Sequence, residues 1–273
     1  MAYTLEDLLK SFLQDGAIHT QPRAIAQSYL HALSEGDIAN HTPWYKNGFT
    51  AGATTTETDV WTSASAYVFP TGAMGMEVVS SDNTQDKAGG TGALGVKIYY
   101  LTATGVEKTE IVTLNGTTVV ATTATDIYRV NAFTVSSVGT GGKPVGNITL
   151  RHLSDTPIYG HIAAGYTKDR SAIYTVPTGK TLYITSLALS TLNAGADKGC
   201  RLTLRATFDD LANGSLTPGV FFMPYFEITA RNGTFFREFE IPLKFIAGTD
   251  IKMSALAEAA ATTCTVAMRG WLE

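Results

Sequence analysis

Apolar and polar side chains alternate along the chain from about Val60 to its end. Residues 200–208 (CRLTLRATF) show this clearly, because small or apolar residues occupy every second position and charged or polar residues lie between them. A period of two places successive side chains on opposite faces of a β-strand, so that one face is buried and the other is solvated. Asn115-Gly116 lies between two apolar runs and predicts a type I′ hairpin turn, since both central residues need positive φ. The pattern predicts antiparallel strands that follow one another closely.

Strands are expected about every ten residues, with turn-forming residues between them. This spacing is typical of a β-sandwich, in which jelly-roll connectivity is one arrangement of the strands. The segment 153–157 (LSDTP) interrupts the alternation and predicts a domain boundary. The fold class is therefore expected to be all-β, with two jelly-roll-like β-sandwich domains over residues 58–154 and 155–273.

The first 35 or so residues have a different, helical pattern. Leu5, Leu8, Leu9, Phe12 and Leu13 recur at helical spacing, and a second such stretch runs over residues 23–33. Two short amphipathic helices are predicted. Their apolar faces need burial, either on the chain's own sheets or on another subunit.

Residues 37–57 show neither period and are rich in turn formers and small polar residues, which predicts an extended arm. Trp44, Tyr45 and Phe49 are isolated aromatic residues in this arm and would need a pocket, so they are candidates for contact with a neighbouring protein, as are Leu5, Leu9 and Phe12. Deletion of residues 1–57 is expected to leave a folded β body that has lost its partner.

Composition agrees with the all-β prediction, because threonine, glycine, alanine and valine are abundant and only 16% of residues are charged. The net charge is −4, and no window is dense enough in Lys and Arg to neutralise a run of phosphates, so nucleic acid is not an expected partner. The start lacks a basic segment followed by an apolar one, and no stretch approaches 18 apolar residues, so neither export nor a membrane span is expected.

The sequence offers little catalytic chemistry. The five histidines show no metal-binding spacing, no G-x-S-x-G motif occurs, and Gly139–Lys143 lacks the spacing of a phosphate-binding loop. The acidic segment 82–86 (DNTQD) could bind Ca²⁺, although a solvated turn is the favoured interpretation. Cys200 and Cys264 are in phase with buried neighbours and are expected to be reduced. No catalytic, cofactor or metal site is predicted.

Residues 221–226 (FFMPYF) are the densest aromatic run. Phe221, Phe222, Tyr225 and Phe226 could stack on sugars, but a run of this kind is more often a strand buried on both faces or at a subunit interface. These four residues are therefore also candidate partner contacts.

Two blocks resemble virion structural proteins of tailed bacteriophages and prophages. They are Gly92–Val135 (GALGVKIYYLTATGVEKTEIVTLNGTTVVATTATDIYRVNAFTV) and Asp155–Ser190 (DTPIYGHIAAGYTKDRSAIYTVPTGKTLYITSLALS). The hairpin sequence YTVPTGKTLYITS, residues 174–186, is the most specific part. The N-terminal 55 residues lie outside the resemblance.

The resemblance implies a part in particle assembly and transfers no catalytic residue. The first hypothesis is a capsid decoration, or cement, protein that acts as a homotrimer, binds the major capsid protein and resides in the virion after assembly in the host bacterial cytoplasm. The alternative is a tail or head-fibre protein that binds a host receptor or a surface glycan. A virion-borne glycan hydrolase is disfavoured because no paired acids are visible.

Overall fold

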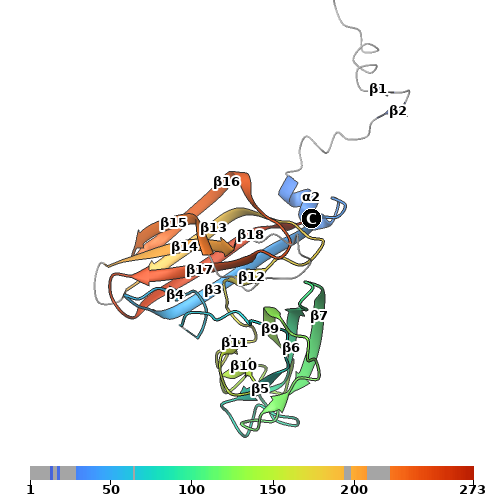
Figure 1. Ribbon diagram of the computed structural model, residues 1–273, viewed down its shortest axis with the longest axis vertical. Coiled ribbons are helices and arrows are strands. Elements are labelled where there is room, and N and C mark those ends of the chain that lie inside the picture. The colour runs from blue at the N-terminus through green and yellow to red at the C-terminus, as the bar shows by residue number, and fades with distance from the viewer. Residues whose placement is uncertain (1–12, 15–16, 19–28, 64, 194–197, 208–221) are drawn as a thin grey trace, which may run out of the picture. The chain divides into compact units, whose positions relative to one another are not determined.

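The computed structural model describes residues 13–14, 17–18, 29–63, 65–193, 198–207 and 222–273 (Figure 1). The chain divides into two units, Met1–Pro43 and Trp44–Glu273, and each is described by itself. Apart from α2, the regular elements of the described residues are β-strands in antiparallel sheets, which confirms the all-β prediction.

In the N-terminal unit, β1 (Leu13–Gln14) pairs with β2 (Ala17–Ile18), and α2 spans Tyr29–Glu35. Of the first predicted helix, only Leu13 and Gln14 are among the described residues, and they form β1 instead of a helix. The second predicted helix corresponds in part to α2. Gly36 ends α2 in the left-handed region, at φ 79°, and the amide of Asp37 donates to the carbonyl of Ala32 at 2.9 Å. This is a Schellman C-cap.

Eight strands of the larger unit form a jelly roll. One sheet has the order β16-β13-β18-β3 and the other β12-β17-β14-β15, with short β4 (Thr58–Asp59) beside β17. In chain order, the first strand pairs with the last, the second with the seventh, the third with the sixth and the fourth with the fifth, as in a jelly roll. The strands are β3 (Thr42–Ala53), β12 (Ile173–Thr175), β13 (Leu182–Leu192), β14 (Gly199–Thr207), β15 (Phe222–Arg231), β16 (Gly233–Phe245), β17 (Asp250–Ala257) and β18 (Thr262–Leu272).

A second sandwich is inserted between the first two strands of this jelly roll, in the connection from β4 to β12. Its sheets have the orders β11-β10-β5-β8 and β7-β6-β9. The boundary predicted after residue 154 lies between its paired strands β10 and β11. The strands are β5 (Met76–Ser80), β6 (Ala93–Leu101), β7 (Glu107–Thr113), β8 (Val120–Ala121), β9 (Arg129–Val138), β10 (Ile148–His152) and β11 (Ile158–Ile162).

Each body has its own apolar core. Leu187, Leu202 and Val266 belong to the core of the jelly roll. Ile98 and Phe133 belong to the core of the inserted sandwich. The two cores explain why alternation runs through most of the sequence, since every long strand covers one of them on one face.

The structure corrects the prediction of an extended arm over residues 37–57, because Thr42–Ala53 is a regular strand. Trp44, Lys46, Gly48 and Thr50 face inward, but only Trp44 is strongly apolar, so the alternation was hidden in the sequence. Gly48 is needed there, since a Cβ atom would lie 2.5 Å from the Cβ of Ala172. Deletion of residues 1–57 would remove the first jelly-roll strand, so a truncation that tests the N-terminal segment must end before Thr42.

Candidate functional site

The predicted partner residues fall in three parts of the chain. Leu5, Leu9, Phe12 and Phe221 lie outside the described residues, as does the side chain of Phe222, whose backbone is in β15. Partner binding by these residues stays a prediction. The other five are placed by the structure as follows.

Trp44, Tyr45 and Phe49 share β3 but have different surroundings. The Trp44 side chain is buried in the jelly-roll core, with its ring centroid 5.1 Å from that of Tyr174. The pocket that Trp44 needs is thus supplied by its own chain. Tyr45 is 62% exposed, and Phe49 is half-buried. The outward pair therefore remains available to a ligand or partner.

Tyr225 and Phe226 follow each other on β15. The Tyr225 ring packs 5.0 Å from the Phe245 ring and remains partly exposed, whereas Phe226 packs 5.6 Å from Phe239 and contacts the jelly-roll core. A register shift in the pairing of β14 with β15 falls at Tyr225, and both rings pack on aromatic residues of β16 while Tyr225 stays 37% exposed. This differs from the sequence-based interpretation of a strand buried on both faces.

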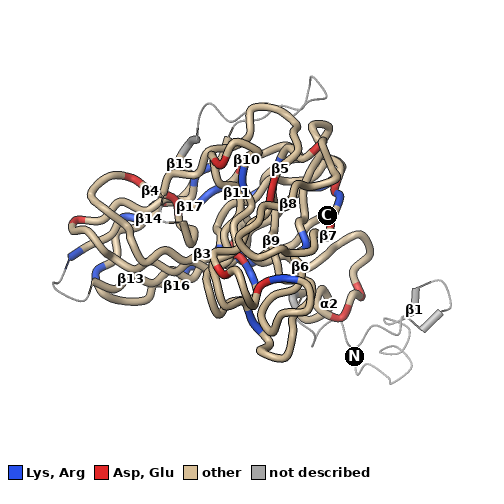
Figure 2. Tube along the Cα trace, turned by 90° about the horizontal axis from the view of Figure 1, so that it is seen from below, with Lys and Arg blue, Asp and Glu red and all other residues tan. Residues whose placement is uncertain are grey.

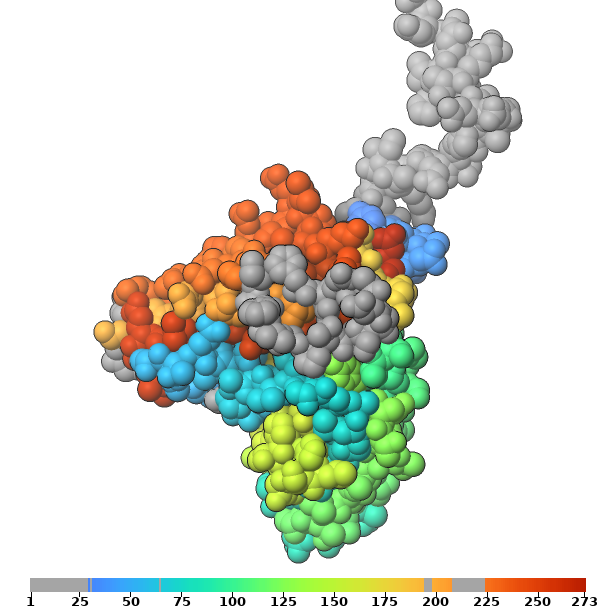
Figure 3. Space-filling model, viewed as in Figure 1, coloured from blue at the N-terminus to red at the C-terminus, as the bar shows by residue number. Residues whose placement is uncertain are grey.

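Sequence reasoning missed the edge strand β16 as an apolar surface. β16 is the last strand of its sheet, and it exposes Phe236 by 54% and Ile241 by 83%. In Figure 3, atoms of the orange β15–β16 region protrude from the surface. Phe and Ile are also typical of buried positions, so the residue types alone do not reveal this exposure. The sequence also does not show which strand lies at the edge of a sheet. Edge strands with exposed apolar side chains favour pairing with another chain.

A buried ion pair joins the jelly roll to the inserted sandwich. Arg129, the first residue of β9, and Asp250, the first residue of β17, are each 1% exposed. The Arg129 Nε donates to Asp250 Oδ1 at 2.9 Å, and its Nη2 donates to Oδ2 at 2.9 Å. Burial opposes the charge on Arg129, but the Asp250 carboxylate outweighs it and raises the pKa of the guanidinium. The bidentate geometry fixes both groups.

Further hydrogen bonds complete this junction. Thr175 donates from its hydroxyl to Asp250 Oδ1 at 2.5 Å, and the Arg129 Nη1 donates to the carbonyl of Pro70 at 2.8 Å. The side-chain amide of Asn131 accepts from the backbone amide of Thr175 and donates to its carbonyl, both at 2.8 Å. These groups serve the contact between the two bodies.

Lys46 and Asp169 form a second buried charged region near the junction. Lys46 donates from Nζ to the carbonyl of Asn131, and Asp169 donates from its backbone amide to the carbonyl of Phe133 at 2.9 Å. Burial lowers the pKa of Lys46 to about 8 and raises the pKa of Asp169 to about 7. Burial thus disfavours the charged form of both side chains.

The acidic segment 82–86 is a turn. Asp82 Oδ1 accepts from the backbone amides of Thr84 at 2.9 Å and Gln85 at 2.5 Å, and these hydrogen bonds, that from Gln85 most, lower the pKa of Asp82. Asp86 is buried and accepts from the backbone amides of Ala93 and Gly146. The carboxylates are thus used by the backbone. Within the described part of the chain, no group of three or more His, Cys, Asp or Glu side chains could hold a metal ion.

Cys200 on β14 and Cys264 on β18 face each other across the jelly-roll core. Both are buried free thiols, with their Sγ atoms 3.3 Å apart. The hydrogen bond to Cys200, together with burial, raises the pKa of Cys264. The pair therefore fills the core as small apolar groups, as the sequence predicts.

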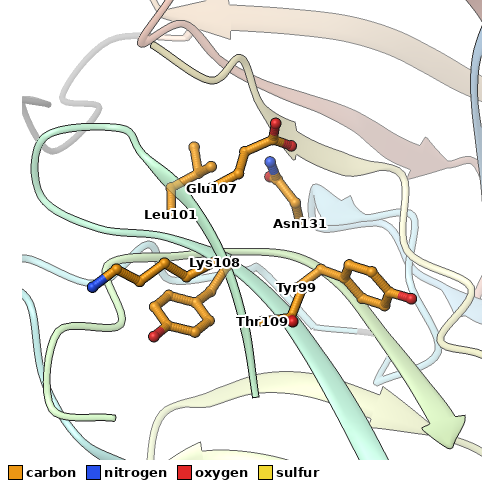
Figure 4. A pocket seen from close by; sticks show the side chains of 7 residues that line it. Tyr99, Leu101, Glu107, Lys108, Thr109 and Asn131 are labelled. Atoms are coloured by element: carbon orange, nitrogen blue, oxygen red, sulfur yellow. The ribbon is translucent and has the colours of Figure 1, made fainter. Parts of the chain in front are cut away.

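A pocket of about 240 Å³ lies on β6 and β7 (Figure 4). Tyr99 and Lys108 extend to opposite sides of it, and Asn131 closes it toward β9. Lys108 forms an ion pair with Asp126 at 2.7 Å, and the Asn131 side chain is hydrogen-bonded to the backbone of Thr175 in β12. Two of the polar side chains that line the pocket thus already have partners within the chain.

Acidic and basic residues are interspersed along the described trace (Figure 2). No helix among the described residues has the length and apolar character of a membrane span.

Comparisons with known proteins give little. No protein-family model matches the chain, and no curated protein matches it. Among solved structures, the chain has a weak likeness to T=1 particles derived from infectious bursal virus, at 11% identity and a TM-score of 0.18, over 85% of this chain and 69% of that chain. A structure of the Gt strain of infectious bursal disease virus is 11% identical with a TM-score of 0.17, over 89% of this chain and 77% of that chain. Scores this low do not establish a shared fold. Neither match is to a tailed phage, so the phage resemblance of the two sequence blocks stays a prediction.

Proposed function

We propose that this chain is a structural component of a phage particle, and specifically a capsid decoration protein that stabilises the head lattice by protein–protein contacts. The observation that carries the proposal is a jelly roll whose edge strand β16 exposes Phe236 and Ile241. Viral capsid domains are among the proteins that use the jelly roll. Because many functions share one fold, the exposed edge is what favours assembly over the other uses.

The edge strand offers two kinds of contact. Its backbone N–H and C=O groups can extend a sheet by one strand, and its exposed apolar side chains can be buried against a partner. The proposed partners are the major capsid protein and two further copies of this chain in a homotrimer. The resemblance of residues 174–186 to virion proteins supports the same conclusion.

The proposal can be tested by co-sedimentation of the purified chain with capsids that lack it. The double variant Phe236→Ser/Ile241→Ser is expected to lose most of the bound fraction and to remain folded, because both side chains are exposed. Ile111→Ser is the matched control, since Ile111 is 63% exposed on β7 of the inserted sandwich. Equal binding by the double variant and the wild type would exclude β16 as the assembly surface.

The second candidate function is receptor or glycan binding by a tail or head-fibre protein. The partly exposed Tyr225 ring on β15 favours it, because an exposed aromatic face can stack on a sugar. Copy number separates the two candidates, since a decoration protein covers the whole head and a fibre protein is present only in small numbers.

A further inference from the structure

Five side chains from β3 and the segment 166–170 gather on the surface of the larger unit. They are Tyr45, Phe49, Tyr166, Lys168 and Arg170, called here the cation–aromatic cluster. The backbone amide of Phe49 donates to the carbonyl of Arg170 at 3.1 Å, which holds the two segments together. The cluster thus joins the outward face of β3 to the connection between β11 and β12, which contains residues 166–170.

The outward face of β3 sets the dimensions of the cluster. Tyr45, Asn47 and Phe49 point outward, since the residues between them are buried. Four residues of strand separate Tyr45 from Phe49 by about 13 Å, at about 3.3 Å per residue. This length fits a short chain of sugar rings.

Arg170 is held between aromatic rings. Its Cζ lies 3.9 Å from the ring centroids of both Phe49 and Tyr166. Such contacts cover the faces of a guanidinium and leave its N–H donors in the plane between the rings. The side chain is therefore oriented before any ligand arrives.

Arg170 differs from the other arginines that are buried or half-buried. Arg129, Arg151, Arg201 and Arg205 each lie within ion-pair distance of a carboxylate, at 2.9, 2.8, 3.6 and 2.7 Å. Among the described residues, Arg170 has no carboxylate within ion-pair distance, and its buried Nε atom has no hydrogen-bond partner. A cationic group that is positioned but not neutralised is suited to an external anion.

Lys168 supplies a second cation at the same surface. Its Nζ lies 5.5 Å from the ring centroid of Tyr45, and no carboxylate in the described residues pairs with it. The intervening Asp169 points inward and is buried, and burial raises its pKa to about 7. Asp169 interacts electrostatically with both Lys168 and Arg170, but its carboxyl group is on the buried side of the segment, so the outward cations remain accessible to an external anion.

We propose that the cation–aromatic cluster binds an acidic saccharide, a pyranose chain that carries carboxylate groups. The exposed rings of Tyr45 and Tyr166 stack on the C–H faces of the sugars. The in-plane donors of Arg170 bind one carboxylate, and Lys168 binds a second. Asn47, exposed between Tyr45 and Phe49, hydrogen-bonds a sugar hydroxyl. This site is independent of the particle contacts proposed for β16.

Other anionic partners fit less well. A nucleic acid would need a run of phosphate contacts, whereas the cluster has two unpaired cations and the chain has a net charge of −4. An acidic peptide would use Arg170 and Lys168 but not the exposed tyrosine faces. The aromatic component thus favours the sugar.

Calorimetric titration of the full chain tests the proposal with two probes, tetragalacturonate and a tetramer of N-acetylneuraminic acid. Binding of at least one is expected. Arg170→Gln is expected to weaken it about tenfold or more, because a charge-assisted hydrogen bond is lost. The methyl ester of the bound sugar, which lacks the charge, should bind as weakly. Arg237→Gln is the control, since Arg237 lies on β16 with its Cζ 6.0 Å from the Phe239 ring centroid.

Tyr45→Ala keeps the test valid if Arg170→Gln fails to fold, since the Tyr45 side chain is 62% exposed. It should also reduce binding. The proposal is overturned if neither acidic tetramer binds, if the methyl ester binds as well as the acid, or if tetraglutamate binds as tightly as the sugar and Tyr45→Ala has no effect.

Discussion

The jelly roll and the inserted sandwich solve the same packing problem with different chain connectivity. The sandwich uses strands from one continuous stretch, β5 to β11, whereas the jelly roll must bring β3 together with β12 and the strands that follow it across the whole insertion. The ion pair between Arg129 and Asp250 lies where the two bodies meet. The difference shows that the inserted sandwich contributes to the packing of the jelly roll, because Arg129 of the sandwich neutralises the buried carboxylate of Asp250 in the jelly roll.

The largest expected effect is that of breaking this ion pair. Arg129→Met leaves the Asp250 carboxylate buried without its counter-ion and is expected to lower the free energy of unfolding by about 3–5 kcal/mol. Urea denaturation measures the loss. Lys108→Met, in a surface pair with Asp126, is the control and should cost less than about 1 kcal/mol. Equal effects of the two variants would show that the junction does not couple the bodies.

Core truncations sharpen the comparison. Leu204→Ala in the jelly roll and Ile98→Ala in the sandwich should each cost about 2–5 kcal/mol, because both side chains are fully buried. If the junction couples the bodies, each variant moves one common transition, followed by fluorescence and by circular dichroism. Two separate transitions, of which each variant moves only one, would contradict the coupling.

The third effect depends on pH. With its pKa raised from 3.8 to about 7, Asp169 makes the folded state hold a proton, so its contribution to stability falls as pH rises through that interval. With its pKa lowered from 10.5 to about 8, Lys46 loses its proton at a lower pH in the folded state than in the unfolded state. The contribution of Lys46 to stability therefore rises with pH above about 8. Relative to Lys46→Met/Asp169→Asn, the wild type should be least stable between about pH 7 and 8.

Denaturation at several pH values checks this profile. Lys108→Met/Asp126→Asn is the matched control, because interaction with Lys108 lowers the pKa of Asp126 and should leave its profile flat from about pH 5 to 8. A wild-type stability relative to Lys46→Met/Asp169→Asn that stays constant with pH would contradict the buried environment of both groups.

The smallest effect is expected at the surface. Phe236→Ser/Ile241→Ser should change the free energy of unfolding by no more than about 1 kcal/mol, since two exposed side chains each contribute within about 0.5 kcal/mol. Thermal denaturation provides the measurement. A loss of several kcal/mol would mean that β16 supports the fold itself, and its exposed residues would then no longer indicate a partner.

The sequence predicts the fold class well because alternation is local. In residues 200–207 the apolar positions are all buried, as the alternation predicts, whereas the intervening positions differ: Arg201 and Arg205 are half-buried, but Thr203 and Thr207 are buried as well. β3 was missed because Lys46, Gly48 and Thr50 are buried without being apolar. The Lys46 ammonium group is satisfied inside by a hydrogen bond to the Asn131 carbonyl, and Gly48 leaves room for the close approach of Ala172. Only the tertiary structure supplies such reasons.

The candidate surfaces were harder to predict. Tyr45 and Phe49 were identified as isolated aromatics, but their cationic neighbours Lys168 and Arg170 are more than 100 residues away along the chain. The exposure of β16 depends on its place at a sheet edge, which follows from strand order and not from its own residues.

The central claim is that the chain is a repeated structural component of a particle. Its most direct test is the copy number of the chain, measured by quantitative gel densitometry, in purified particles of the proposed phage. Hundreds of copies per virion are predicted for a decoration protein that covers the head. A count in the low tens or below would contradict that role and would favour a tail or fibre component.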